Sequence, residues 1–336
     1  ERIYIEYIIG ETEKTFHIQG KLKRNQKISN LYWIPKTQVL DDPYFEPVDV
    51  EVDFTKYEEL DSESRHPFDH QKRGIEFLLS RDRCILGDGM GLGKTMQATI
   101  AALESEANKV LIICPSSLKI NWEREINCFD NNTQIVEGRE WKDDKFTIIN
   151  YDILKNFHTS PSEKKKDKYK KEAPITDIVD SEFDLIIIDE AHKIKDHKSQ
   201  RGEIVRDICV NHGPENKKVW LLTGTPIANR PMDFFNLLRV VKHPVTTNWK
   251  FFATRYCQGK QITKKLKNGS KRKIWLTNGA SNLDELNKKL DNTLLRRRKE
   301  DVLDMPEKII TPVHHTLTKK QEKEYDDLWD DYLERR

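Results

Sequence analysis

The chain has 336 residues, of which 36% are hydrophobic and 34% charged, and its formal net charge is +2. The apolar share is enough for a folded core, and a basic surface for nucleic acid would have to come from local clustering. No apolar run approaches the roughly 18 residues of a membrane span, which argues against a membrane partner. Five scattered cysteines, none at zinc-binding spacing, favour an intracellular protein, nuclear in a eukaryote and cytoplasmic in a bacterium or phage.

Residues 1–60 differ from the rest of the chain. Ile3–Ile9 and Thr15–Ile18 are rich in β-forming residues and flank the turn-like segment Gly10–Glu13, which predicts a hairpin. Leu31–Ile34 predicts a further strand. We expect a small β-rich appendage, which serves either substrate recognition or solubility.

From residue 61 to about residue 240, helical and strand patterns alternate. The predicted helices cover 69–80, 95–104 and 118–129, and the predicted strands cover 84–86, 110–114, 146–150, 183–188 and 219–222. Strands that are apolar throughout indicate a sheet buried on both faces. The expected fold is therefore α/β, a mostly parallel sheet with helices on both faces. Residues 241–336 are expected to form a helical extension.

Two basic segments interrupt this pattern, one within residues 160–182 and the other at 258–279. Each is either a solvated loop or a flap that contacts phosphates.

A phosphate-binding loop is predicted at Gly91–Thr95, because this glycine-rich stretch joins a strand to a helix. Glycines allow the backbone N–H groups to converge on one centre, which the helix N-terminus also faces. Lys94 would reach the β- and γ-phosphates, and the Thr95 hydroxyl would bind Mg²⁺. The strict pattern has glycine where this chain has Asp88. The alternative is a structural turn with an exposed lysine.

Two carboxylates follow the apolar strand that ends at Ile188. Asp189 and Glu190 stand where open α/β sheets bind ligands, so Asp189 would hold Mg²⁺ through water and Glu190 would polarise the attacking water. The alternative is helix N-capping. Thr223, Gly224, Thr225 and Pro226 follow another strand and would couple nucleotide state to nucleic-acid grip, unless they form only a turn.

The order of these motifs resembles the first RecA-like lobe of superfamily-two helicases, of the SWI/SNF-type double-stranded-DNA translocases. The resemblance covers about residues 65–320, and its elements are Phe68–Gly74, the phosphate loop, Cys114–Leu118 with Trp122, Asn150–Asp152, the tetrad Asp189–His192, Thr223–Pro226, Leu295–Leu303 and Met305–Lys308. Arg255–Cys257 and Gly279–Leu286 resemble the annealing-helicase (HARP-type) branch, whose members rewind DNA.

The resemblance implies ATP and Mg²⁺ as cofactors and duplex or forked DNA as partner. Gln71 would recognise adenine, His192 would join the coupling residues, and the 241–336 extension would be the family's protrusion. The phosphate cradle would be Asp88, Gly89, Met90, Gly91, Leu92, Gly93, Lys94 and Thr95. The family has glutamate at the position of Gly89. DNA phosphates would be contacted by Ser116, Ser117 and Lys119. Arg296–Arg298 would be a solvated helix end or a brace.

The predicted function is an ATP-dependent double-stranded-DNA translocase that remodels forks or anneals strands. Such motors need a second RecA-like lobe to supply arginines to the phosphoryl group, and the roughly 30 residues after Pro306 are too few for one. We therefore expect this chain to bind ATP and to hydrolyse it slowly or not at all. The alternatives are an RNA helicase, which Thr223–Pro226 and Leu295–Leu303 argue against, and a nucleotide-gated DNA-binding scaffold.

Overall fold

The computed structural model describes residues 4–11, 15–23, 26–27, 32–35, 48–57, 66–138, 140–142, 144–158, 178, 181–214, 217–224, 230–265, 271–304 and 316–334. The chain divides into two compact units, residues 1–302 and 303–336. The second unit contains the helix α10 (Lys319–Glu334), as the sequence predicts. Within the described ranges, no helix combines the length and the apolar character that a bilayer span requires.

The first unit is built on a seven-stranded sheet with the order β13-β5-β10-β9-β6-β8-β7. Its strands in chain order are β5 (Arg83–Leu86), β6 (Val110–Cys114), β7 (Thr133–Ile135), β8 (Phe146–Asn150), β9 (Leu185–Ile188), β10 (Lys218–Leu222) and β13 (Leu294–Leu295). Every pairing in this sheet is parallel. The predicted parallel sheet is thereby confirmed, and β7 and β13 are strands that the sequence analysis missed.

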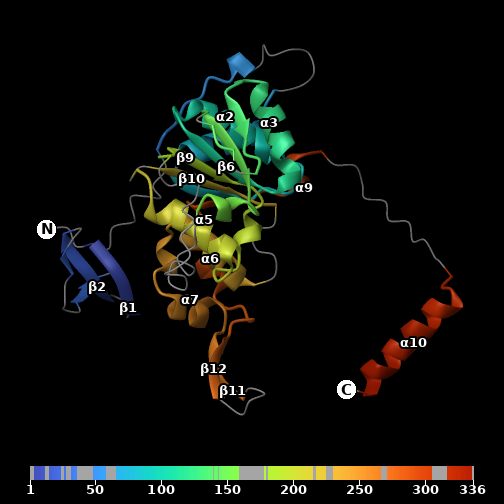
Figure 1. The fold of residues 1–336 in the computed structure, drawn as a ribbon. Helices are drawn as coiled ribbons and strands as arrows, with labels where there is room; N and C mark the ends of the chain where they lie inside the picture. Colours follow the sequence, from blue (N-terminus) through green and yellow to red (C-terminus); the bar gives the residue numbers. More distant parts are fainter. Residues whose placement is uncertain are drawn as a thin grey trace. The chain divides into compact units, whose positions relative to one another are not determined.

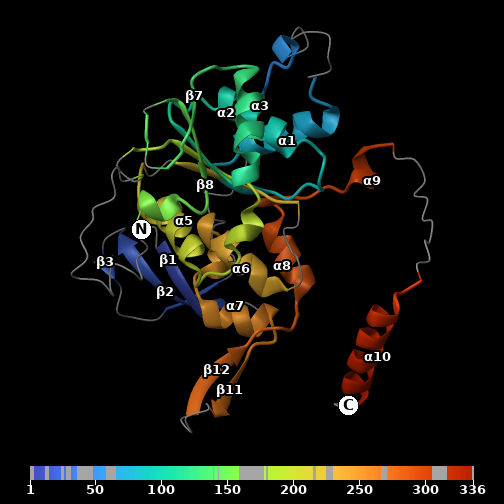
Figure 2. The same ribbon diagram turned by 45° about the vertical axis from the view of Figure 1, so that its right-hand side comes forward.

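Helices cover both faces of this sheet because its strands point alternate side chains into two separate cores. Ile85 of β5 packs with residues of α5 (Gln200–Asn211) and α6 (Pro231–Val240). Its neighbours Cys84 and Leu86 pack on the other face with α1 (Asp69–Leu79), α2 (Lys94–Glu104) and α3 (Lys119–Asn127). Figures 1 and 2 show these two layers with the sheet between them. This two-sided burial explains why the strand sequences are apolar throughout.

Residues 4–35 form a separate antiparallel sheet. Strand β1 (Tyr4–Glu11) pairs with β2 (Thr15–Lys23), which also pairs with β3 (Gln26–Lys27) and β4 (Tyr32–Pro35). The hairpin and the further strand lie where the β-rich sequence predicts them. The division into 1–60, 61–240 and 241–336 stays a prediction.

The chain after α6 contains more than helices. It forms α7 (Trp249–Tyr256), a hairpin of β11 (Lys260–Lys265) and β12 (Lys271–Leu276), and α8 (Leu283–Leu290). It then returns to the main sheet as β13, parallel to β5. The expectation of a solvated loop at 258–279 is therefore wrong for its described strands, because opposed pairs such as Ile262 and Ile274 hold two strands together. The basic residues 164–171 lie outside the described part.

Candidate nucleotide-binding site

The predicted motifs follow strands of the same parallel sheet, so they meet at one edge. The phosphate loop follows β5, the carboxylate pair follows β9, and Thr223 and Gly224 follow β10, which lies between β5 and β9. The Thr223 N–H donates to the Leu86 carbonyl over 3.1 Å, which fixes the end of β10 against the start of the phosphate loop. This carboxyl edge is the place where open α/β sheets bind ligands.

The phosphate loop has a backbone that only glycine adopts easily. Gly91 and Gly93 have φ values of 81° and 72°, in the left-handed region that side chains disfavour. A Cβ atom on Gly93 would also lie 2.2 Å from Gln71 Nε2. The loop turns directly into α2, whose first residue is Lys94. The strand, loop and helix that a phosphate site requires are therefore all present.

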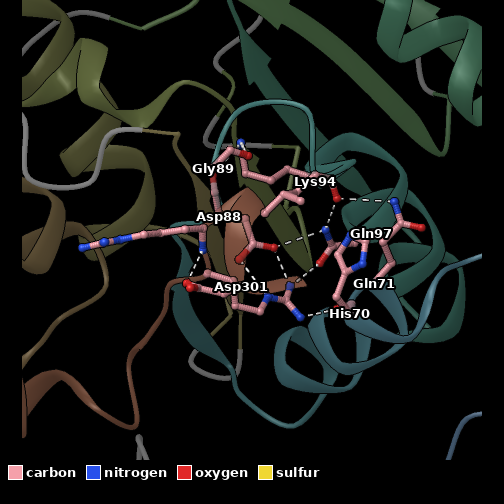
Figure 3. Close-up of polar contacts among 10 residues, drawn as sticks. His70, Gln71, Asp88, Gly89, Lys94, Gln97 and Asp301 are labelled. Carbon is pink, nitrogen blue, oxygen red and sulfur yellow. Dashed lines mark hydrogen bonds and ion pairs between the residues drawn. The ribbon is translucent and has the colours of Figure 1, made fainter. Parts of the chain in front are cut away.

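The Lys94 ammonium group lies over the phosphate loop. Its Nζ donates to the carbonyls of Asp88 and Gly89 over 2.9 and 3.2 Å, as Figure 3 shows. Burial lowers the pKa of Lys94, and the charges of Glu190, Asp88 and Asp189 oppose that shift. A desolvated cation held only by carbonyls and nearby carboxylates is well suited to receive a phosphate anion.

Asp189 is held in a defined position. The Trp122 Nε1–H donates to Asp189 Oδ2 over 2.9 Å, and the Tyr151 hydroxyl donates to the Asp189 carbonyl over 2.6 Å. Burial raises the pKa of Asp189, while hydrogen bonds from Trp122 and from the Glu190 N–H counteract the rise. A buried, oriented carboxylate whose charge acts on Lys94 fits the oxygen ligands of Mg²⁺. The contribution of Trp122 was not predicted, although the residue stands in the Cys114–Trp122 motif.

Glu190 has a strained backbone, with φ 50° and ψ 49° in the left-handed region that non-glycine residues seldom adopt. Its Oε2 lies 3.0 Å from Nδ1 of His192. Such strain is concentrated at functional sites and persists only where neighbouring contacts enforce it. The structure therefore places Glu190 and His192 together beside Asp189.

Gly224 approaches the phosphate loop closely. A Cβ atom at this position would lie 2.9 Å from Met90 Cγ and 3.6 Å from Lys94 Nζ. Gly224 thus lets β10 end against the loop, and Thr223 is fully buried beside it. Thr225, the remaining predicted coupling residue, lies outside the described residues.

Gln71 contacts the phosphate loop through its side-chain amide. Oε1 accepts from the Phe68 N–H over 2.9 Å, and Nε2 donates to the Leu92 carbonyl over 3.3 Å. Gln71 is therefore bound to protein groups at the entrance of α1, and its predicted recognition of adenine stays a prediction.

Asp88 is held by a residue from far along the chain. Arg297, just after β13, donates from Nε to Asp88 Oδ1 over 3.0 Å and from Nη2 to Oδ2. Arg297 also donates to the His70 carbonyl and to Gln97 Oε1, the latter over 3.0 Å. Figure 3 shows Asp88, His70 and Gln97 around these contacts. The Arg297 carbonyl accepts from the Gly89 N–H over 2.9 Å. For Arg297, the brace interpretation of the arginine cluster matches the geometry.

The predicted DNA-contacting residues lie at the end of β6. Ser116 and Ser117 are exposed, in a short 3-10 turn that leads into α3. Lys119 is directed back to the protein, because its Nζ lies 3.4 Å from the Val136 carbonyl and 3.9 Å from Glu137 Oε1. Their contact with DNA stays a prediction.

Comparison with known proteins identifies the family. The model of the SNF2-related domain matches residues 70–335. A Caenorhabditis elegans homologue of SWI/SNF-related matrix-associated actin-dependent regulator of chromatin subfamily A-like protein 1 is 36% identical over 266 residues, covering 72% of this chain and 32% of its own length. The DNA annealing helicase and endonuclease ZRANB3 of Bos taurus is 32% identical over 277 residues, covering 78% of this chain and 24% of its own length.

Among solved structures, the SWI2/SNF2 ATPase core of Sulfolobus solfataricus in complex with dsDNA is similar in fold. Its TM-score is 0.50 at 24% identity, and the match covers 79% of this chain and 53% of that one. This chain therefore spans about half of that core and a third or less of the two curated relatives. With its RecA-like sheet and the family match over residues 70–335, the chain belongs to the SNF2-related ATPase family.

Proposed function

We propose that this chain is the ATP-binding lobe of a motor that moves along double-stranded DNA. The observation that carries the proposal is the convergence of Lys94, the Asp189–Glu190 pair and Gly224 at one edge of the sheet. The charges of both carboxylates act on Lys94, and a Cβ atom added at Gly224 would lie 3.6 Å from the Lys94 ammonium nitrogen. The proposed phosphate-binding loop, metal-binding carboxylate and coupling segment thus lie at the ends of neighbouring strands, around Lys94.

Each residue of the proposed site has a separate role in nucleotide hydrolysis. Loop N–H groups and Lys94 bind the phosphates, Thr95 and Asp189 bind Mg²⁺, and Glu190 orients the attacking water. When bound, Mg²⁺ neutralises charge on the phosphate oxygens. Trp122 and Tyr151 hold Asp189 in one orientation, and His192 Nδ1 lies 3.0 Å from Glu190 Oε2. Gln71 would recognise adenine. The coupling of nucleotide state to DNA grip would fall to His192, Thr223, Gly224 and Thr225.

DNA is proposed as the partner, gripped by its phosphates so that the motor is indifferent to sequence. Ser116, Ser117 and Lys119 would provide contacts at the end of β6. Relatives of this chain include a protein named as a DNA annealing helicase, which favours fork remodelling or strand annealing as the specific task. In a eukaryotic host the protein would act in the nucleus, and in a bacterial or phage context in the cytoplasm.

A second RecA-like lobe in the same protein is proposed to complete the active site, because phosphoryl transfer is accelerated by arginines supplied from outside the phosphate loop. The chain by itself should bind ATP and hydrolyse it slowly. A rate for this chain equal to that of the protein with both lobes would contradict this part of the proposal.

The test combines ATP binding with DNA-stimulated hydrolysis. ATP affinity is measured on this chain and on Lys94→Ala, which should lose it. Hydrolysis is measured on the protein with both lobes, in the presence of duplex DNA, forked DNA, single strands or RNA. Stimulation by duplex or fork that Lys94→Ala abolishes would support the translocase. Stimulation by RNA alone would indicate an RNA helicase, and ATP binding without stimulation by any of them would indicate a nucleotide-gated scaffold.

A further inference from the structure

The hairpin of β11 and β12 lies within the most one-sided charge cluster of the described extension. Between residues 258 and 279 the sequence has seven Lys or Arg residues and no Asp or Glu, although the whole chain carries a formal net charge of only +2. The described members with exposed side chains are Lys260, Lys264, Lys271, Arg272 and Lys273. Within the described ranges, none of these five forms an ion pair with a carboxylate. Their charge is therefore presented to solvent.

The strand register increases this charge density. Lys264 stands directly opposite Arg272, and Thr263 opposite Lys273, in an antiparallel pairing. Like charges on directly opposed positions destabilise a strand pair. An isolated hairpin is itself marginal in water. The arrangement thus costs folding free energy in the absence of a polyanion and is relieved when one binds.

The base of the hairpin is fixed to the helices beneath it. The indole rings of Trp275 and Trp249 are in edge contact, with centroids 5.4 Å apart. The Gly259 N–H donates to the Ala253 carbonyl over 2.8 Å, and the Ser281 N–H donates to the Tyr256 carbonyl over 2.9 Å. Figures 1 and 2 both show the hairpin projecting beyond α7. The cations are therefore carried by an anchored arm.

One of the acidic residues of α8 is already engaged by α7. Glu285 of α8 accepts hydrogen bonds from Arg255 and, over 2.8 Å, from the Tyr256 hydroxyl. Glu285 therefore neutralises Arg255 rather than a cation of the hairpin. The hairpin's aromatic residue, Trp275, is half-buried and packs edge-on against Trp249, so the hairpin carries no fully exposed aromatic ring among its described residues. Single-strand binders combine basic grooves with aromatic stacking platforms, so this surface fits a backbone rather than bases.

We propose that the β11–β12 hairpin is a second DNA contact of this lobe, and that it binds the phosphate backbone of duplex DNA. This inference rests on the proposed function, because it takes DNA as the partner. Its residues lie on the extension, whereas the contacts predicted by family resemblance lie at the end of β6. The hairpin would act as an electrostatic anchor that is indifferent to base sequence.

The test is the salt dependence of duplex binding by this chain without nucleotide. The variant replaces Lys264, Arg272 and Lys273 with Gln and is compared with the unchanged chain by fluorescence anisotropy on a labelled duplex. Each phosphate contact contributes about 0.9 to the slope of log K against log salt. The slope should fall by about 2 to 3 in magnitude. ATP affinity should stay unchanged, and the melting temperature should not fall, because a repulsive pair is removed.

A matched control removes the same charge elsewhere. Lys319, Lys320 and Lys323 of α10 are exposed and are also changed to Gln. An equal loss of slope in both variants would overturn the proposal, since net charge alone would then explain the effect. Equal competition by poly-glutamate and by unlabelled duplex would overturn it as well.

Failure of this inference is distinguishable from failure of the proposed function. If the unchanged chain binds duplex and the hairpin variant keeps its slope, the hairpin is not a contact and the translocase proposal stands. If the unchanged chain binds no duplex even at low salt, the hairpin proposal is overturned, and the translocase proposal is decided separately by DNA-stimulated hydrolysis in the protein with both lobes. Binding of single strands that is tighter than duplex and equally sensitive to the hairpin changes would overturn the duplex assignment.

Discussion

Arg297 and Asp88 form a two-pronged ion pair between residues 209 positions apart in the chain. The Asp88 side chain is fully buried and that of Arg297 is 13% exposed. Asp88 begins the phosphate loop, and its carbonyl accepts from Lys94. The pair therefore joins the segment just after β13 to the part of the loop that contacts Lys94.

Replacing Arg297 with Met should destabilise the chain by about 3 kcal/mol, because a buried carboxylate loses its counter-charge. The double variant Asp88→Asn with Arg297→Met should recover much of that loss, since no unpaired charge remains. Urea unfolding measures both. Arg298→Met is the matched control, because the Arg298 side chain is exposed. Equal losses in the single and double variants would show that the ion pair is not the cause.

Trp122→Phe should raise the Mg²⁺ concentration needed for ATP binding by about tenfold, because partners that orient a metal ligand typically contribute that much. The Trp122 hydrogen bond to Asp189 Oδ2 lowers the pKa of that carboxyl. The substitution removes this hydrogen bond. Nucleotide titrations at several Mg²⁺ concentrations provide the measurement. Trp220→Phe is the control, since Trp220 is equally buried and donates to the Arg81 carbonyl instead. The same Mg²⁺ shift in both variants would argue against a specific role for Trp122.

Gly74→Ala should be destabilising, although alanine in place of glycine inside a helix ordinarily gains up to about 1 kcal/mol. The new Cβ would lie 1.8 Å from Gln97 Oε1 and 2.8 Å from Arg297 Nη2. Displacing these groups should cost about 1 to 3 kcal/mol and weaken ATP affinity through Asp88. Thermal unfolding and nucleotide titration measure the two effects, and adding Gln97→Ala should relieve part of the strain. A more stable Gly74→Ala variant would show that the packing around Arg297 is looser than the structure indicates.

The free energy of unfolding should decrease as the pH is lowered below about 6.5, because of His243. Burial lowers the pKa of His243 from 6.5 to about 4, although a hydrogen bond to the Lys289 carbonyl opposes the shift. In the folded chain the ring stays neutral, with Nδ1 accepting from the Val245 N–H. Between pH 6.5 and 4 the unfolded chain binds a proton at His243 and the folded chain does not. The contribution of the neutral His243 ring to the free energy of unfolding is therefore complete above pH 6.5 and is lost on acidification.

The decrease in the free energy of unfolding that is due to His243 should approach about 3 kcal/mol at pH 4. Urea unfolding at several pH values should show a smaller decrease in His243→Gln than in the unchanged chain. Parallel curves would assign the acid sensitivity to other groups.

The sequence predicts well whatever depends on contiguous patterns. Apolar runs such as 110–114 and 185–188 identified central strands, because a strand buried on both faces needs apolar residues throughout. Strand-end motifs identified Lys94, Asp189 and Gly224 as neighbours, since parallel strands end at one edge. The hairpin was missed because exposed lysines conceal the two-residue alternation that marks a strand. The Arg297–Asp88 pair joins distant segments, and three consecutive arginines do not show which one turns inward.

Strand β5, which leads into the phosphate loop, pairs with β10 on one side and with β13 on the other. The chain therefore leaves the sheet after β10, on one side of β5, and returns to it as β13 on the other side. The extension is consequently tethered by two anchors rather than hinged at one. A force on the far end of this segment, such as a pull by DNA bound to the hairpin, would be transmitted to both β10 and β13. It would also reach Asp88 through Arg297. The predicted nucleotide site would therefore bear part of any force applied to the hairpin. Force on bound DNA and occupancy of the nucleotide site would then influence each other.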